Sequence, residues 1–380
     1  MHTETKRIQF LDFLRGFAVI FMVMGHSIDS VLSRELRSTQ GFILYDAVRG
    51  FTAPIFLFVS GFAYIIATER RWDDLRRFSA PTAKRALKVL LLFVIGYALH
   101  FPFFSFGKLV TEATAEHLAQ FFQADILHCV GASLLLLQLA LFITPTRRAF
   151  AMTVLALTAF IVLASPIVWR IDFAPILSPA LSPYMNQMQV SIFPLFPFAA
   201  FLFTGVAAGH FFLEARETNR EREFIRRWGV LAIVSLAAGI LFDLVPVSLY
   251  PPHDYWKTSP NWFLVRIGIV MILALGVHSV RRLPATLEKN LVLLGQASLL
   301  IYPVHLIIVY GSAANGGLMQ LVGQTLAAHQ AVGVGVLVLV SMVGLTYAWN
   351  YIRTHHFIPA RLIQVGIAST LLYSFFTRPW

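Results

Sequence analysis

Ten apolar runs, each long enough to cross a membrane as a helix, constrain this chain more than any other feature of its sequence. A bilayer core about 30 Å thick needs roughly 20 apolar helical residues. Hydrophobic residues make up 57% of the 380 residues and charged residues only 13%, which excludes a soluble globular domain. The runs fall near residues 10–30, 51–68, 87–106, 125–143, 149–167, 191–213, 228–246, 261–280, 290–310 and 330–351. We therefore predict an all-α, polytopic membrane helical bundle of about ten transmembrane helices, forming a single integral-membrane domain over residues 1–380.

Both ends of this pattern need a separate interpretation. The first run follows Lys6 and Arg7, as in a secretory signal, but no small-residue cleavage pattern comes after it. We expect an uncleaved first span. A shorter run near 363–376 predicts either an eleventh span or an interfacial segment. The single cysteine, Cys129, excludes an intramolecular disulfide and is expected to be buried.

Basic residues predict the topology. The net charge of +11 comes from short clusters between the apolar runs, which points to membrane orientation and not to a nucleic-acid partner. With the N-terminus in the cytoplasm, these clusters fall on the inner side, in segments 69–86, 144–148, 214–227, 281–289 and 352–362. The proline-containing segments 168–190 and 246–260 then become irregular outer loops. We expect a multi-pass protein of a bacterial inner membrane.

Arg15 and His26 share one face of the first span. Eleven helical steps of about 100° make roughly three full turns, which places the two side chains about 16 Å apart along the helix. Cations and imidazoles inside a membrane are costly, so such residues are functional candidates by default. In the predicted orientation, Arg15 lies near the inner end and His26 near the outer end. The alternative is an anchoring arginine and an interfacial polar cap.

Polar neighbours of His26 extend this candidate site. Asp29 follows it by three residues, a spacing at which a carboxylate can fix the imidazole tautomer. Tyr302 and His305 stand in the outer half of the ninth span, beside Pro303, which places a second imidazole at the depth of His26. We interpret His26, Asp29 and His305 as catalytic candidates.

Other polar residues give weaker signals. Arg49 stands at the outer end of the second span and can attract an anion, and Ser60 precedes a glycine that allows close backbone approach. We assign cofactor binding to Arg15, Arg49, Ser60 and Tyr302. Two further pairs, either acceptor ligands or structural contacts, are Asp125 with His128 and Asn261 with Arg266, whose guanidinium is expected to face the bundle interior. The histidines show no zinc-type spacing, and we expect no metal.

The motif residues together resemble a known family. The run from Leu11-Asp12-Phe13-Leu14-Arg15-Gly16 to His26 resembles the Arg-x10-His signature of the transmembrane acyltransferase superfamily, which includes the acyltransferase-3 and heparan-alpha-glucosaminide N-acetyltransferase groups. Segments 54–62 and 302–305 resemble its second-helix and late Tyr/His motifs, and segments 125–131 and 193–205 are closer to the bacterial heparan-acetyltransferase-like branch. The resemblance covers nearly the whole chain.

Membership would imply transfer of an acetyl or acyl group from cytoplasmic acyl-CoA, most simply acetyl-CoA, to a carbohydrate or glycoconjugate across the membrane. The partners would be acyl-CoA, that acceptor and the lipid bilayer, with homo-oligomers left open. By the motif, Arg15 and His26 would be the functional pair, with His305 and Tyr302 lining the same cavity. The animal heparan enzymes carry an asparagine at the position of His26 and a reactive histidine in the next loop, but residues 30–50 here contain no histidine. His26 is therefore the better candidate.

The sequence leaves two other classes of function open. A transporter or flippase for a lipid-linked sugar or small anion would use the same arginine and histidine as a substrate and proton relay. Release of free CoA in the presence of a sugar acceptor separates it from an acyltransferase. A catalytically inactive membrane scaffold is disfavoured by the clustering of His26, Asp29, Tyr302 and His305. The sequence leaves open which acceptor is used, whether it is O- or N-acylated and which acyl chain is transferred. Transfer can be direct or pass through an acyl-enzyme.

Overall fold

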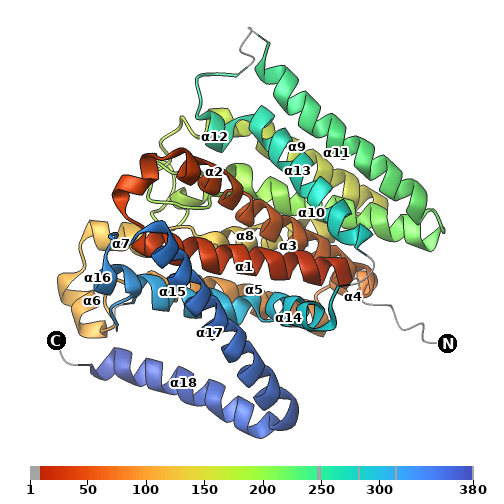
Figure 1. Ribbon diagram of the computed structural model, residues 1–380. Coiled ribbons are helices and arrows are strands. Elements are labelled where there is room, and N and C mark those ends of the chain that lie inside the picture. Colours follow the sequence, from red (N-terminus) through yellow and green to blue (C-terminus); the bar gives the residue numbers. More distant parts are fainter. Residues whose placement is uncertain (1–8, 246–249, 281–282, 313–314, 379–380) are drawn as a thin grey trace. The chain divides into compact units, whose positions relative to one another are not determined.

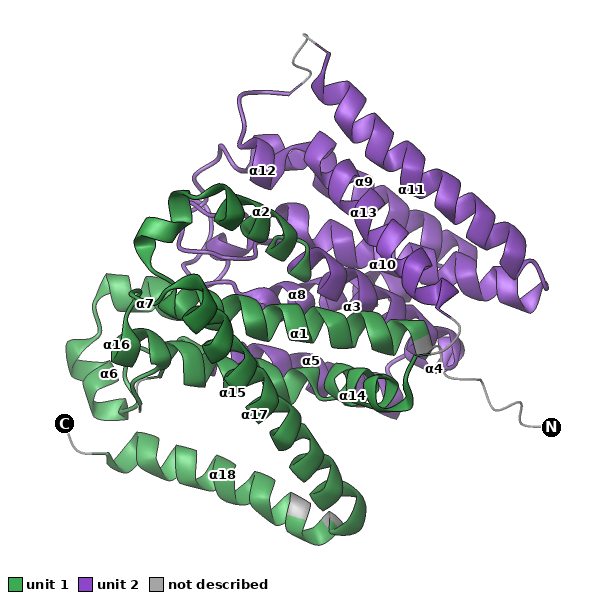
Figure 2. Cartoon of the chain, in the orientation of Figure 1, with its two compact units in different colours: residues 1–52, 99–121, 282–380 green, residues 53–98, 122–281 purple. Residues whose placement is uncertain are grey.

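The computed structural model describes residues 9–245, 250–280, 283–312 and 315–378. Lys6, Arg7, Pro246, Arg281 and Arg282 lie outside these ranges. Every regular element of the described residues is a helix (Figure 1). The chain divides into two compact units: residues 1–52, 99–121 and 282–380 form unit 1, and residues 53–98 and 122–281 form unit 2 (Figure 2).

Helices of membrane-spanning length and apolarity confirm the polytopic bundle. In the described residues eight qualify, and the pair α14 (Ala285–Gln296) and α15 (Ser298–Tyr310) qualifies as a ninth although it is bent by 81°. The eight are Phe10–Val31, Gln40–Glu69, Ile126–Ile143, Arg147–Val168, Leu195–Glu217, Glu221–Asp243, Pro260–Ser279 and Ala328–His355. Each overlaps one of the predicted runs, and Gln40–Glu69 begins 11 residues before the predicted run at 51–68. The predicted run at 290–310 corresponds to this bent pair, which confirms an apolar segment of spanning length and adds a break between the two helices.

The remaining two predicted runs are also helices. The run at 87–106 is α5 (Ala80–Leu99), which carries Lys84, Arg85 and Lys88 in its first half. It ends seven residues early because the residue before Pro102 is disfavoured in helical conformation. The run at 363–376 belongs to α18 (Phe357–Thr377), most of whose described residues are exposed.

Unit 1 is built around α1. Its elements are α1 (Gln9–Val31), η1 (Arg34–Ser38), α2 (Gln40–Arg49), α6 (Phe106–Glu112), α7 (Ala115–Phe121), α14 (Ala285–Gln296), α15 (Ser298–Tyr310), α16 (Leu318–Val322), α17 (Ala328–His355) and α18. A buried cluster joins α1 to α14, α15 and α17; it contains Val19, Val23, Leu294, Ile301, Val338 and Met342. This core positions one face of α1 against α15.

Two glycines let α1 and α14 meet backbone to backbone. A Cβ at Gly16 would overlap the carbonyl oxygen of Leu291, and one at Gly295 would lie 2.7 Å from the carbonyl oxygen of Asp12. Small residues at such crossings are typical of membrane helix pairs. Arg15 therefore lies at the α1–α14 crossing, where its Cβ is 3.4 Å from the place that a Cβ at Gly295 would take.

Gly16→Ala is accordingly expected to destabilise the protein by about 1–3 kcal/mol, because the added methyl meets backbone atoms that cannot rotate away. The measurement is the apparent Tm in detergent. Gly344→Ala in α17 is the matched control, since no atom lies within 4 Å of the position that its added methyl would take. Equal Tm values for both variants would contradict the close crossing.

Unit 2 contains the other long helices. They are α3 (Thr52–Glu69), α4 (Trp72–Leu75), α5, α8 (Ile126–Ile143), α9 (Arg147–Val168), η2 (Ser182–Tyr184), α10 (Leu195–Glu217), α11 (Glu221–Asp243), α12 (Tyr255–Thr258) and α13 (Pro260–Ser279). Gly61 and Gly205 make a reciprocal crossing of α3 and α10, each packed on the other helix's backbone. The largely irregular loop at 168–190 agrees with the prediction, but α12 shows that 246–260 was wrongly expected to lack a helix. Asp254 caps α12 by accepting from the amide of Trp256.

In unit 2, helix ends that the predicted topology assigns to the same side of the membrane contact one another. Glu69 at the end of α3 bonds Arg147 at the start of α9, 2.9 Å away. Gln138 near the end of α8 donates to the carbonyl of Leu75, 2.8 Å away. At the opposite end, the amides of Ile192 and Phe193 donate to the carbonyl of Ala124. Segments assigned to one side of the membrane thus contact one another.

Candidate active site

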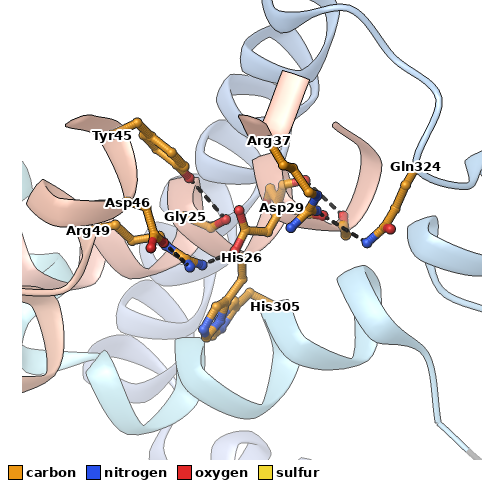
Figure 3. A network of polar contacts seen from close by, with 11 residues as sticks. Gly25, His26, Asp29, Arg37, Tyr45, Asp46, Arg49, His305 and Gln324 are labelled. Atoms are coloured by element: carbon orange, nitrogen blue, oxygen red, sulfur yellow. Dashed lines mark hydrogen bonds and ion pairs between the residues drawn. The ribbon is translucent and has the colours of Figure 1, made fainter. Parts of the chain in front are cut away.

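Two histidines from distant parts of the sequence meet in unit 1. His26 on α1 and His305 on α15 lie with Nδ1 of the first 2.9 Å from Nε2 of the second. Their ring planes are nearly parallel, inclined by 7°, with centroids 5.2 Å apart (Figure 3). His305 is fully buried, whereas His26 is half-buried. The expectation of two imidazoles at one depth is confirmed as a direct contact.

The hydrogen bonds of His305 determine the tautomers of the pair. Its Nδ1 lies 2.8 Å from the carbonyl oxygen of Ile301, which can only accept, so Nδ1 carries the proton. In the neutral ring Nε2 then has the lone pair and accepts from Nδ1–H of His26. The basic lone pair of His26 is therefore on Nε2. An imidazole held in this way by a second group is the arrangement of an oriented general base.

Two tyrosines border the histidine pair. The ring of Tyr302 lies 5.9 Å from that of His305, and the ring of Tyr310 lies 5.8 Å from that of His26. Tyr302 is buried, and Tyr310 ends α15 at the surface. The contact of Tyr302 with His305 agrees with the motif. Tyr310 was missed, because sequence alone does not show which residue of the helix end turns toward α1.

Asp29 was predicted to contact His26, but it pairs with other residues in the structure. Its Oδ2 forms an ion pair with Nη1 of Arg49, and Arg37 donates to its backbone carbonyl at 2.7 Å (Figure 3). No hydrogen bond joins Asp29 to His26 in the described part of the chain. A spacing of three residues brings side chains near each other on a helix, but Arg49 on α2 forms an ion pair with the Asp29 carboxylate instead. His305, not Asp29, orients His26.

Arg49 is correspondingly not an isolated cation. Besides Asp29 it bonds Asp46, with Nη2 2.6 Å from Oδ1. Its aliphatic stem packs on Gly25, where a Cβ would lie 3.0 Å from Cδ of Arg49. The predicted attraction of an anion by Arg49 is therefore weakened by two carboxylates. The visible role of Arg49 is to hold α2 against α1 next to His26.

We expect Asp29→Asn and Arg49→Gln to lower activity by similar, moderate factors of about tenfold or less. Their effects should be non-additive, with a coupling energy of about 0.5–3 kcal/mol, because each removes the same ion pair. A double-mutant cycle on kcat/KM measures this. If Asp29 oriented the base directly, Asp29→Asn alone would be much the more damaging substitution.

The other predicted site residues lie elsewhere. Arg15 is half-buried on α1, about 16 Å along the helix from His26. Ser60 belongs to unit 2, where its hydroxyl donates to the carbonyl of Phe56 at 2.7 Å. Arg266 is half-buried, with its guanidinium 5.1 Å from the ring centre of Trp262. Cys129 is fully buried, as predicted.

A second acid–histidine pair lies in unit 2. Oδ1 of Asp125 is 2.7 Å from Nδ1 of His128, which confirms that the two residues pair. The His128 ring packs on Tyr97 with centroids 4.2 Å apart, and the hydroxyls of Tyr97 and Tyr184 are 3.0 Å apart. Burial and the bond to Tyr97 raise the pKa of the Tyr184 hydroxyl, so it stays protonated. Asp125 also caps α8 through the amides of Leu127 and His128, which gives the pair a structural role.

A third polar cluster was not found from the sequence. Glu69 binds both Arg147 and His210, whose Nδ1 is 3.0 Å from Oε1. His210 lies at the end of the apolar part of α10, and its spacing carries no motif. Only the packing of α3, α9 and α10 brings the three residues together. The available signal was a single histidine that follows a long apolar stretch, two turns before the charged end of α10.

Comparison with known proteins supplies a family. The family model for the catalytic region of heparan-alpha-glucosaminide N-acetyltransferase matches residues 7–238, more than half of the chain. The matched region contains Arg15, His26, Asp29, Arg49 and Ser60, whereas Tyr302 and His305 lie beyond it. No curated protein matches the chain.

Proposed function

The chain belongs to the family of the heparan-alpha-glucosaminide N-acetyltransferase catalytic region, and from this premise we propose that it moves an acetyl group from cytoplasmic acetyl-CoA to a carbohydrate acceptor on the far side of the membrane. Membership makes it a multi-pass membrane acetyltransferase. The observation that carries the proposed chemistry is the hydrogen bond between His26 and His305. We place the site in a bacterial inner membrane.

In the proposed reaction His26 acts as general base. Its Nε2 takes the proton from an acceptor hydroxyl or amine as the acceptor oxygen or nitrogen attacks the thioester carbonyl. The carbon–sulfur bond breaks, and the proton returns from the imidazolium to the CoA thiolate. His305 supports the imidazolium because its Nε2 accepts from Nδ1–H of His26 in both states. Direct transfer needs no further nucleophile.

Arg15 is proposed to hold the phosphorylated head of acetyl-CoA. Its separation from His26 by about 16 Å corresponds to the reach of an extended pantetheine arm. A guanidinium can bind phosphate through two parallel hydrogen bonds. The donor would then run along α1, with the head at the Arg15 end and the thioester at the His26 end.

Arg15→Ala should therefore weaken acetyl-CoA binding by about 10- to 150-fold, the value of one charge-assisted hydrogen bond of roughly 1.5–3 kcal/mol. The substitution should leave kcat at saturation much less affected. Calorimetry with acetyl-CoA measures the affinity, and Arg15→Lys should retain part of it. Unchanged affinity in Arg15→Ala would count against this role.

The function itself is tested with purified protein in lipid nanodiscs. Acetyl-CoA and a set of amino sugars and neutral glycosides are added, and both free thiol and acetylated sugar are measured. Release of CoA together with stoichiometric acetylated product supports acetyl transfer. Sugar or anion uptake into proteoliposomes without any CoA release would support the transporter instead.

A further inference from the structure

Helix α2 has one face that packs on α1 beside His26. Tyr45 donates from its hydroxyl to the carbonyl of Gly25 at 3.3 Å, and Arg49 binds Asp29 one turn beyond His26. Phe42 packs with Tyr45 against a buried cluster that contains Ile28. Residues 42, 45 and 49 follow helical spacing, so they form a single inward stripe. This stripe ties α2 to the wall of the candidate active site.

The opposite face of α2 is aliphatic and open. Ile43, Leu44 and Val48 are exposed by 54%, 68% and 51%. Ala47 completes the face, so four apolar residues at positions i, i+1, i+4 and i+5 point away from α1. Such a face beside an active site is stable only where hydrocarbon covers it.

The length of the apolar segment that contains α2 indicates that membrane lipid covers its aliphatic face. Residues 40–69 together form a span-length stretch of 30 residues, whereas about 20 suffice to cross the bilayer core. The ten residues of α2 exceed the length that a span needs. An amphipathic helix that a break separates from the end of a span is expected to lie along the membrane interface. Tyr45, Arg37 and Arg49 are side chains typical of that level.

A rim of polar side chains lies around Asp29, next to α2. Asp46 lies on α2 with its carboxylate half-exposed, and Arg34 donates to Gln324 at 3.0 Å on the surface. Arg37 and Gln324 both donate to the carbonyl of Asp29, one turn beyond His26 (Figure 3). Carboxylates, guanidinium groups and amides are the groups that bind sugar hydroxyls. Next to His26, unit 1 therefore offers a hydrophilic rim and a hydrocarbon surface together.

We propose that the acceptor is a membrane-anchored sugar, with its head at the polar rim and its hydrocarbon tail along Ile43, Leu44 and Val48. This inference rests on the proposed function and narrows its acceptor to an amphiphile. A tail lying in the leaflet brings the hydroxyl or amine to the depth of His26 without passage through bulk water. A freely soluble saccharide would make no use of the aliphatic face.

The first test compares methyl and octyl glycosides of one sugar as acetyl acceptors in nanodiscs. Wild-type protein should prefer the octyl glycoside in kcat/KM by at least about tenfold, since each buried methylene contributes about fourfold. Part of this preference comes from partitioning of the octyl glycoside into lipid. The decisive value is therefore the ratio of kcat/KM for the octyl glycoside to kcat/KM for the methyl glycoside, compared between variants and wild type. In the variant Ile43→Ser with Leu44→Ser and Val48→Ser, the ratio should fall at least about fourfold, which is the loss of roughly one methylene contact.

The control variant carries Val336→Ser, Leu337→Ser and Val340→Ser on α17, residues equally exposed in unit 1. Its ratio should equal that of wild type. An unchanged ratio in the α2 variant would overturn the proposal. A change in oligomeric state with an unchanged ratio would assign the face to a second copy of the chain instead. If wild type acetylates neither these glycosides nor any other acceptor of the set named above, the proposed function fails, and a second measurement decides the position of α2.

That measurement places a spin label on Leu44→Cys in a Cys129→Ser background. Collision with oxygen in preference to a water-soluble nickel chelate supports lipid contact. The reverse preference, showing α2 in water, would overturn the inference whatever the activity.

Discussion

His26→Ala should abolish acetyl transfer while the helical bundle stays folded. Loss of a general base costs about 10²- to 10⁴-fold in rate. His26 is half-buried, and among the described residues its side-chain hydrogen bond is to His305, so its removal leaves the core of α1 in place. The rate of formation of acetylated glycoside at saturating acetyl-CoA measures the effect, and acetyl-CoA affinity should be nearly unchanged.

His329→Ala is the matched control, because His329 is an exposed histidine of the same unit. It should retain wild-type activity. The Tm of both variants should stay close to that of wild type. Full activity in His26→Ala would remove this residue from the mechanism, and a low Tm would assign it a structural role.

His305 has the second largest expected effect. It contributes an acceptor to Nδ1–H of His26, so His305→Leu, which fills space but accepts no hydrogen bond, should lower kcat about 100-fold. His305→Gln carries a carbonyl oxygen that can accept the same bond and should recover a substantial part of kcat. Neither substitution should change KM for acetyl-CoA strongly.

Comparison of the two variants separates orientation from packing. Without an acceptor at Nδ1, the His26 imidazole samples both tautomers, so the loss of kcat in His305→Leu should persist at every pH. His305→Gln should lose less kcat over the same pH range. Equal losses in the two folded variants would contradict the positioning role.

The helices and the partnership of the two histidines were predictable from the sequence. Spanning runs are determined by composition alone, and the depth of His26 and His305 follows from counting residues along them. The break between α14 and α15 was not predictable in this way. Gly295 stands one residue before the end of α14, but a single glycine in an apolar run is equally typical of a close helix crossing, so it does not identify a break.

Side-chain partners were harder to predict than positions. Asp29 was expected to bond His26 because both lie on one helix, but Arg49 from α2 competes for the carboxylate. Glu69, Arg147 and His210 are brought together only by tertiary packing of three helices. Spacing along one helix identifies which residues share a face, whereas the charges supplied by neighbouring helices decide which of them pair.

The most direct test of acetyl transfer at His26 is an experimental structure with a non-transferable acetyl-CoA analogue bound. We predict the phosphorylated head near Arg15 and the acyl carbonyl beside His26, with room for an acceptor atom within hydrogen-bonding distance of Nε2. An acyl group bound away from His26, or a head group away from Arg15 with the carbonyl unreachable from Nε2, would contradict the proposed mechanism.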